Sequence, residues 1–164
     1  MTSFAVLGDR NAGKTVFMHH ATHRRVPLNI FTLTRTAHFQ WQGALHSSAD
    51  FSVLPGACTN EALARALHGV DGLIVLYKQD IGTARQWLCR AAQCVQGVHA
   101  VPSLVVCTGA AHSDVNLTEL LRAFPCAQHA YVQSAVGAQD CVNRIVTRAR
   151  RYPPSPLEMH ATMQ

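Results

Sequence analysis

Four residues near the start of the chain have the types and the spacing of a phosphate-binding loop. Gly8, Gly13, Lys14 and Thr15 match the pattern G-x-x-x-x-G-K-[ST]. A glycine-rich turn that runs into a helix lets several backbone N–H groups converge on one anion. In such a loop the lysine reaches the β and γ phosphates, and the hydroxyl ligates Mg²⁺. We therefore expect the phosphate contacts to come from Asp9, Arg10, Asn11, Ala12, Gly13, Lys14, Thr15 and Val16.

The chemistry of this loop requires a strand before it and a helix after it. The preceding segment, "SFAVLG", has the apolar run of a buried strand, and Lys14 to about His23 has the pattern of a helix. The motif therefore lies in the context that phosphate binding needs. The alternative is an ordinary strand-to-helix turn with a solvated lysine.

The rest of the chain alternates short apolar runs with helical patterns, which is typical of an α/β sheet with crossover helices. Two segments, "TLTRTAHFQWQG" and "ALHSSADFSVLPG", flank the Gln42-Gly43 turn and predict a hairpin. Three more segments, "DGLIVLY", "PSLVVCTG" and "HAYVQSA", predict further strands. Apolar residues at helical spacing predict helices over 60–68, 84–95, 117–124 and 141–149.

Length and composition indicate a single globular domain. The 164 residues are 48% hydrophobic and 14% charged, unlike a disordered chain. We expect the domain to cover residues 1–151. Residues 152–164, "YPPSPLEMHATMQ", then form a proline-containing tail.

Charge and targeting signals limit the partners and the location. The net charge is +5, but the basic residues are scattered, so we expect no nucleic-acid surface and only a general attraction to phosphate or to an acidic partner. The six cysteines contain no C-x-x-C pair and no secretory signal precedes them, which favours free thiols and a cytoplasmic location. No apolar run is long enough to span a bilayer and neither end carries a lipidation motif, so we expect no membrane insertion or lipid anchor.

One phosphate loop at the N-terminus, then a hairpin, then alternating strands and helices resembles the Ras-like small GTPases over residues 3–151. "LGDRNAGKT" is most similar to the Rab branch. Ser134 and Ala135 are similar to the family's guanine-capping Ser-Ala-Lys, and Thr108 begins the segment where the family reads the base. The resemblance implies a Ras-like P-loop fold, with a mostly parallel six-stranded sheet and helices on both faces. It also implies bound GTP or GDP with Mg²⁺.

Two residues of the family's hydrolytic machinery are replaced. In the family's Asp-x-x-Gly the carboxylate holds a Mg²⁺-bound water, and here "VLPG" has Val53 in its place. The glutamine that orients the attacking water would follow the glycine, and the chain has Ala57. We therefore expect weak Mg²⁺ binding and little or no hydrolysis.

The base-reading Asn-Lys-x-Asp is replaced by "TGAA", residues 108–111. Guanine selectivity depends on that carboxylate accepting two hydrogen bonds, so we expect little preference for GTP over ATP. Asp114 follows three residues later and is a second candidate for reading the base. Its neighbours also have the types of helix-capping residues, so capping is the alternative.

Two further positions of the resemblance stay open. Arg10 stands where Ras proteins have a glycine beside the γ-phosphate, and it either crowds the site, faces solvent or stabilises phosphate charge from within the chain. The switch threonine that completes the metal shell should lie just before the hairpin. Thr32 and Thr34 both fit the spacing. We predict Thr15 and Thr34 as the metal ligands.

These observations support three functions. The first is a divergent small-GTPase-like subunit of a protein complex with little or no hydrolysis, similar to the Rab-like subunit of the intraflagellar transport complex. That resemblance implies a protein partner and a location in the cytoplasm, with the cilium or flagellum as the specific site. The second is a cycling GTPase in intracellular transport. The third is a small-molecule phosphotransferase of the nucleotide-kinase type, for which Asp80 in "YKQD" is the one candidate acid.

Two clusters of side chains remain outside this interpretation. His19, His20 and His23 lie about one turn apart on the first helix, and no neighbouring acid or thiol completes a metal site. Arg144, Arg148 and Arg151 form a basic stripe on the last helix. Cations near a helix C-terminus are favourable by themselves, and an acidic partner is the alternative explanation.

Overall fold

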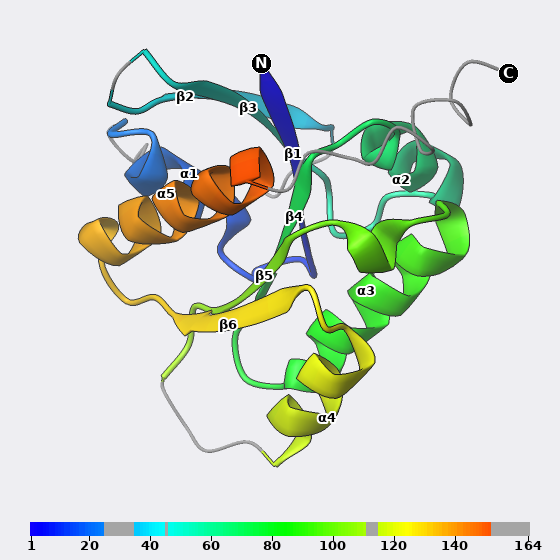
Figure 1. Cartoon of the computed structure of the whole chain (residues 1–164). Helices are drawn as coiled ribbons and strands as arrows, with labels where there is room; N and C mark the ends of the chain where they lie inside the picture. The colour runs from blue at the N-terminus through cyan, green and yellow to red at the C-terminus, as the bar shows by residue number, and fades with distance from the viewer. Residues whose placement is uncertain (25–34, 45, 111–114, 152–164) are drawn as a thin grey trace, which may run out of the picture.

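The computed structural model describes residues 1–24, 35–44, 46–110 and 115–151. Thr32, Thr34, Asp114 and the expected tail of residues 152–164 lie outside these ranges. The described ranges form an α/β fold with one six-stranded, mostly parallel sheet and five α-helices (Figure 1). The α/β class and the six-stranded sheet predicted above are therefore confirmed.

The sheet brings the carboxyl ends of its parallel strands to one edge. Its order is β2-β3-β1-β4-β5-β6; β2 is antiparallel to β3, and the other neighbouring pairs are parallel. The loops that follow parallel strands at this edge are the usual place for a ligand in such sheets. The strands are β1 Thr2–Gly8, β2 Ala37–Gln42, β3 Ser48–Val53, β4 Gly72–Tyr77, β5 Ser103–Cys107 and β6 Ala127–Tyr131.

Helices cover both faces of the sheet, as expected (Figure 1). One face carries α1 Lys14–Ala21 and α5 Ala135–Arg151. The other carries α2 Asn60–Leu67, α3 Ile81–Cys94 and α4 Asn116–Ala123. A short 3₁₀ helix, Val98–Ala100, precedes β5. None of the helices in the described ranges is both long and apolar enough to cross a membrane.

The central strands are apolar throughout because both of their faces are covered. In β1, Phe4 and Val6 join the core beneath α1 and α5, whereas Ala5 and Leu7 join the core beneath α2, α3 and α4. All six residues of β4 are buried in the same way. This continuous burial fixes β1 in the middle of the sheet, and with it the loop that follows Gly8.

The connection between β2 and β3 is longer than predicted. The antiparallel ladder ends at the pair Gln42 and Ser48, so the two strands are not joined by a tight turn at Gln42-Gly43. The N–H of Gly43 donates to the carbonyl of Ser47 at 2.8 Å and closes this connection. The hairpin prediction is confirmed, and the position of its turn was wrong.

The last strand begins and ends earlier than predicted. The sequence placed it over "HAYVQSA", residues 129–135, whereas β6 covers Ala127–Tyr131. The ladder with β5 sets this limit, because its last pair joins Cys107 and Tyr131. Ser134 and Ala135 therefore belong to the start of α5 and not to a strand.

Candidate functional site

The predicted phosphate loop joins β1 to α1 at the edge where the parallel strands end. Three residues of the motif hold positive φ angles, 153° at Gly8, 68° at Asn11 and 84° at Gly13. A Cβ at Gly8 would lie 2.6 Å from the carbonyl O of Leu76, so the neighbouring strand leaves no room for a side chain there. The N–H of Ala12 donates to the carbonyl of Asp9 at 3.1 Å and closes a turn within the loop. The glycines are therefore required by the backbone path.

The N-terminus of α1 opens onto this loop. Lys14, Thr15 and Val16 form its first turn, and the N–H groups of a first turn have no partner inside the helix. Among the described residues no side chain caps this end, and the first turn contains no acid. Its partial positive charge is therefore available to an anion.

Lys14 places an ammonium group in the centre of the loop. Its side chain is 6% exposed, and Nζ donates to the carbonyl oxygens of Gly8 and Asp9, the latter at 2.9 Å. Burial lowers the pKa of Lys14 to about 8, against the opposing influence of Asp9 and Cys58. A second negative group at the loop would offset this desolvation. The lysine is thus held where the motif predicts, on carbonyls that a phosphate would replace or supplement.

Thr108 ties the end of β5 to the phosphate loop. Its hydroxyl donates to the carbonyl of Ala12 at 2.8 Å and approaches that of Tyr77 at 3.3 Å. A Cβ at Gly13 would lie 3.6 Å from the Thr108 hydroxyl oxygen. The sequence predicted Thr108 as a ligand contact. Its donor supports the loop, and only the oxygen lone pairs remain for a ligand.

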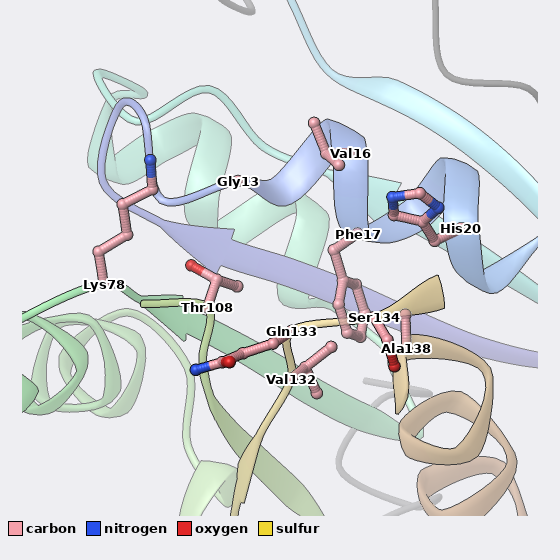
Figure 2. Close-up of a pocket in the computed structure, with 10 residues that line it drawn as sticks. All are labelled: Gly13, Val16, Phe17, His20, Lys78, Thr108, Val132, Gln133, Ser134 and Ala138. Atoms are coloured by element: carbon pink, nitrogen blue, oxygen red, sulfur yellow. The ribbon is translucent and has the colours of Figure 1, made fainter. Parts of the chain in front are cut away.

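A cavity of about 250 Å³ begins at Gly13 and runs along α1 (Figure 2). One wall consists of Val16, Phe17 and His20, and Figure 2 shows the Phe17 ring directed away from α1 into this space. Lys78, at the end of β4, extends toward the phosphate loop. The cavity is smaller than the ~300–1,000 Å³ typical of sites for drug-sized ligands, which favours one ring system over an extended molecule.

The remaining wall comes from the β6–α5 connection, through Val132, Gln133, Ser134 and Ala138. The Gln133 amide donates to the carbonyl of Gly109 at 3.1 Å, so it is fixed beside the end of β5. The Ser134 hydroxyl accepts the N–H of Gly137 at 3.1 Å and caps α5. Ala135 is the first residue of that helix. Both residues of the predicted capping pair therefore lie at this helix end, and Ser134 lines the cavity.

Lys78 and Gln133 were missed by the sequence analysis. Neither belongs to a recognisable motif, and only the order of β4, β5 and β6 in the sheet brings them beside the phosphate loop. Two predicted residues of the loop, Arg10 and Asn11, are exposed and line no part of this cavity.

The segment after β3 packs directly on the phosphate loop. A Cβ at Gly56 would collide with the backbone N of Arg10 and lie 2.9 Å from the carbonyl carbon of Asp9. Val53, which replaces the family's carboxylate, is fully buried in the core beneath α1 and α5. Ala57 is exposed. Neither residue brings a polar group to the loop.

Two residues of α3 fasten this segment to the loop, and we call them the α3 clasp. Trp87 donates its indole N–H to the Asp9 carboxylate at 2.8 Å. The Arg90 guanidinium lies 5.0 Å from the Trp87 ring centroid and donates to the carbonyl of Cys58 and to the Asn60 side chain. No sequence pattern indicates the clasp, because Trp87 and Asp9 are 78 residues apart.

Metal ligands are sparse in the described ranges. No group of three His, Cys, Asp or Glu side chains there could hold a metal ion. His19 packs edge-on against Phe39 with its pKa lowered by burial, whereas His23 contacts Gln139, so the histidines of α1 have different neighbours. Thr15, in the first turn of α1, is the predicted metal ligand that lies within the described structure.

Comparison with known proteins does not place the chain in a family. No protein-family model matches it, and no curated protein sequence matches it. The resemblance to the Ras-like small GTPases therefore stays a proposal, supported by the phosphate loop and by the order of strands and helices.

Proposed function

We propose that the chain is a divergent Ras-like nucleotide-binding protein that holds GTP or GDP, and with similar affinity ATP or ADP, as a subunit of a protein complex. The observation that carries this proposal is the buried Lys14 ammonium in a loop that opens both onto the N-terminus of α1 and onto a cavity. The strand order and the helices on both faces support the Ras-like P-loop fold as the finer description.

The phosphates would bind to the loop. The N–H groups of the first turn of α1 and the Lys14 ammonium supply positive charge at one point. The Thr15 hydroxyl would ligate Mg²⁺ beside the phosphate oxygens. Asp9, the acid nearest in sequence, is engaged by Trp87, and Val53 offers no carboxylate. Mg²⁺ would therefore depend mainly on the phosphates for its ligands, which predicts weak retention of the metal.

The base would follow α1 into the cavity beyond Gly13, with the sugar between the base and the loop. Among the described lining residues there is no carboxylate to accept the two hydrogen bonds that distinguish guanine. Thr108, Lys78 and Gln133 offer a hydroxyl, an ammonium and an amide, which together fit either purine. Little selectivity between guanine and adenine follows.

Hydrolysis should be slow or absent. The reaction needs a water held in line with the γ-phosphate and stabilisation of the developing charge. Val53 is buried, Ala57 has no polar group, and the α3 clasp holds the segment that contains Ala57 against the loop. These features favour a bound nucleotide that stabilises a binding surface over a cycling switch. The phosphotransferase alternative is disfavoured because the Asp80 carboxylate caps α3 through the N–H of Gly82 at 2.8 Å.

A protein partner is part of the proposal, and so is a cytoplasmic location. Both come from the resemblance to Rab-like proteins, as do the cilium or flagellum and the intraflagellar transport complex as the specific setting. Val53 and Ala57 stand where the family has its hydrolytic residues. A nucleotide-binding protein that does not hydrolyse its ligand can still act by binding a partner, and this supports a partner as part of the proposal. The proposal includes neither a nucleic-acid ligand nor a lipid anchor.

Lys14→Ala tests the proposal. The purified wild type should either carry nucleotide, seen by chromatography of the extracted ligand, or be stabilised by added GDP or ADP. At a hundredfold excess over the dissociation constant, a ligand adds about 2.7 kcal/mol to the free energy of unfolding. That corresponds to roughly 5–10 °C in melting temperature for a chain of this size.

The variant should lose both effects, whereas Arg122→Ala, which removes an exposed cation on α4, should retain them. Equal nucleotide content and equal ligand-induced stabilisation in Lys14→Ala and the wild type would contradict the proposed phosphate site. Preference of the wild type for GDP over ADP by a thousandfold would contradict the proposed base site alone.

A further inference from the structure

A second cavity, of about 390 Å³, lies between β6 and the C-terminal half of α5. We call it the α5 groove; it is lined by Gln128 from β6 and by Asn143, Arg144, Thr147, Arg148 and Arg151 from α5. Gln128 lies near the start of β6, so the groove is at the opposite edge of the sheet from the phosphate loop. It is therefore separate from the proposed nucleotide site.

Arg148 is fixed in this groove and only half satisfied. Its Nη2 donates to the carbonyl of Cys126 at 3.0 Å, which holds the plane of the guanidinium. Its Nη1 is buried and has no hydrogen-bond partner within the part of the chain that the structure describes. A buried donor without an acceptor is unfavourable. A rotation of the partly exposed guanidinium toward the groove would bring this donor to an acceptor on a ligand and remove that penalty. Favourable placement of cations at a helix C-terminus does not account for this atom.

The other groove arginines are also without a neutralising acid in the described ranges. Arg144 donates to the side-chain carbonyl of Gln128 at 3.3 Å, which is a neutral acceptor. The ion pair in the described ranges lies away from the groove and joins Arg85 on α3 to Glu119 on α4. Asp140, one helical turn before Arg144, is exposed and forms no ion pair with it. The groove lining itself contains no carboxylate.

The spacing of the arginines matches an extended peptide. Arg144 and Arg148 are four residues apart, which is about 6 Å of rise along a helix. Alternate residues of an extended chain are about 6.6 Å apart and point to the same side. Guanidinium groups bind carboxylates through paired N–H donors, and Asn143, Thr147 and Gln128 offer partners for a peptide backbone.

We propose that the α5 groove binds an extended acidic segment of a partner protein, with carboxylates at alternate positions paired to Arg148 and Arg144. The charge complementarity of the lining and the unsatisfied Arg148 Nη1 carry this assignment. Peptide binding in the α5 groove requires no nucleotide. A result that contradicts the proposed nucleotide site would therefore leave the groove proposal intact, and a result that contradicts the groove would leave the nucleotide site intact.

The test is fluorescence anisotropy of a labelled hexapeptide with glutamate at alternate positions and serine between them. The full-length wild type should bind it, and affinity should fall as ionic strength rises, because the contacts are partly exposed ion pairs. Replacing glutamate by glutamine in the peptide should abolish binding. Arg148→Gln should weaken binding about tenfold or more, the loss expected for one or two charge-assisted hydrogen bonds.

Matched variants separate site binding from general attraction to a basic protein. Arg122→Gln removes the same charge from the exposed surface of α4 and should change affinity less than about twofold. Arg148→Lys keeps the charge but loses the planar fork, and should weaken binding nearly as much as Arg148→Gln. If Arg148→Gln unfolds, as judged by circular dichroism, the exposed Arg144→Gln serves in its place.

Several results would overturn the proposal. These are no binding by the wild type up to about 1 mM protein, equal losses in Arg148→Gln and Arg122→Gln, or binding of the glutamine peptide. Two further measurements use vesicles of anionic lipid and, separately, inorganic phosphate as a competitor. Loss of vesicle binding in Arg148→Gln without peptide binding by the wild type would assign the groove to a membrane, and competition by phosphate alone would assign it to a small anion.

Discussion

Lys14 is the residue in which burial and charge conflict most directly. The ammonium is protonated at neutral pH, yet the loop removes it from solvent and lowers its pKa to about 8. Its partners among the described residues are two carbonyl oxygens and no carboxylate oxygen. A bound phosphate would stabilise the charged form, so binding of the anion and of the proton should be coupled.

Nucleotide affinity should therefore fall as pH rises through about 8. In the free protein the protonated fraction of Lys14 drops from about 0.9 at pH 7 to about 0.1 at pH 9, while the phosphate keeps it protonated in the complex. The expected loss is about tenfold between these two pH values. Isothermal titration calorimetry measures it, and at pH 8.5 the heat should also depend on the buffer, because binding takes up a proton.

Lys14→Arg is the control for this coupling, because an arginine stays charged over the whole range. If Lys14→Arg binds nucleotide, its affinity should be nearly constant between pH 7 and pH 9. A constant wild-type affinity over this range, with no proton uptake, would contradict the role given to Lys14.

At the scale of elements, α3 connects two segments that are far apart in the sequence. Trp87 and Arg90 lie one turn apart on it, and together they contact the phosphate loop and the segment that follows β3. A segment held by several contacts opens less readily than one held by none. Here the anchors are a hydrogen-bonded indole, a stacked guanidinium and the close approach of Gly56 to the loop.

Trp87→Phe should loosen the phosphate loop without disturbing the fold. The phenyl ring keeps the contact with Arg90 but loses the donor to Asp9, which costs about 1 kcal/mol or less because Asp9 is exposed. Lost packing of the buried indole adds to this cost, so the melting temperature should fall by at least roughly 2–4 °C. The specific readout is the dissociation rate of a fluorescent nucleotide, which we expect to rise severalfold.

Trp41→Phe is the matched control, because Trp41 on β2 is equally buried and lies outside the α3 clasp. It should lower stability through lost packing and leave the nucleotide dissociation rate unchanged. Equal dissociation rates in Trp87→Phe and Trp41→Phe would mean that the clasp does not support the site.

At the scale of the whole molecule, the two cores give the six cysteines very different exposure. Cys89 is exposed, Cys58, Cys94 and Cys126 are partly buried, and Cys107 and Cys141 are buried. Burial raises the pKa of the Cys141 thiol, which lowers the fraction of reactive thiolate at any given pH. Cys107 closes β5 next to the proposed site. The reaction rate of the exposed Cys89 therefore reports on local exposure, and the rates of the buried Cys107 and Cys141 report on opening of the whole fold.

Alkylation by iodoacetamide at pH 7.5, followed by peptide mass spectrometry, should modify Cys89 first and Cys107 and Cys141 last. Since the buried thiols react only when the molecule opens, nucleotide should slow them in proportion to the stabilisation it supplies, about a hundredfold at a hundredfold excess over the dissociation constant. The rate at Cys89 should not change. Fast, nucleotide-independent alkylation of Cys141 would contradict the packing of α5 on the sheet.

The sequence by itself determined the local parts of this protein. The spacing of Gly8, Gly13 and Lys14 and the apolar runs around them predicted a strand, a loop and a helix, because these depend on residues a few positions apart. The same reasoning predicted the α/β class and the hairpin. It misplaced the turn after Gln42 and the last strand, because a strand ends where its partner ends.

Only the tertiary structure decided which distant residues surround the loop. Thr108 reaches Ala12 across 96 residues, and Trp87 reaches Asp9 across 78. No periodicity encodes such pairs, since they depend on the order of strands in the sheet and on the face that each helix covers. The same placement made Ser134 a helix cap and left Arg148 with an unsatisfied donor in the α5 groove. Local spacing thus predicted the loop between β1 and α1, and the packing of the sheet determined which residues surround it.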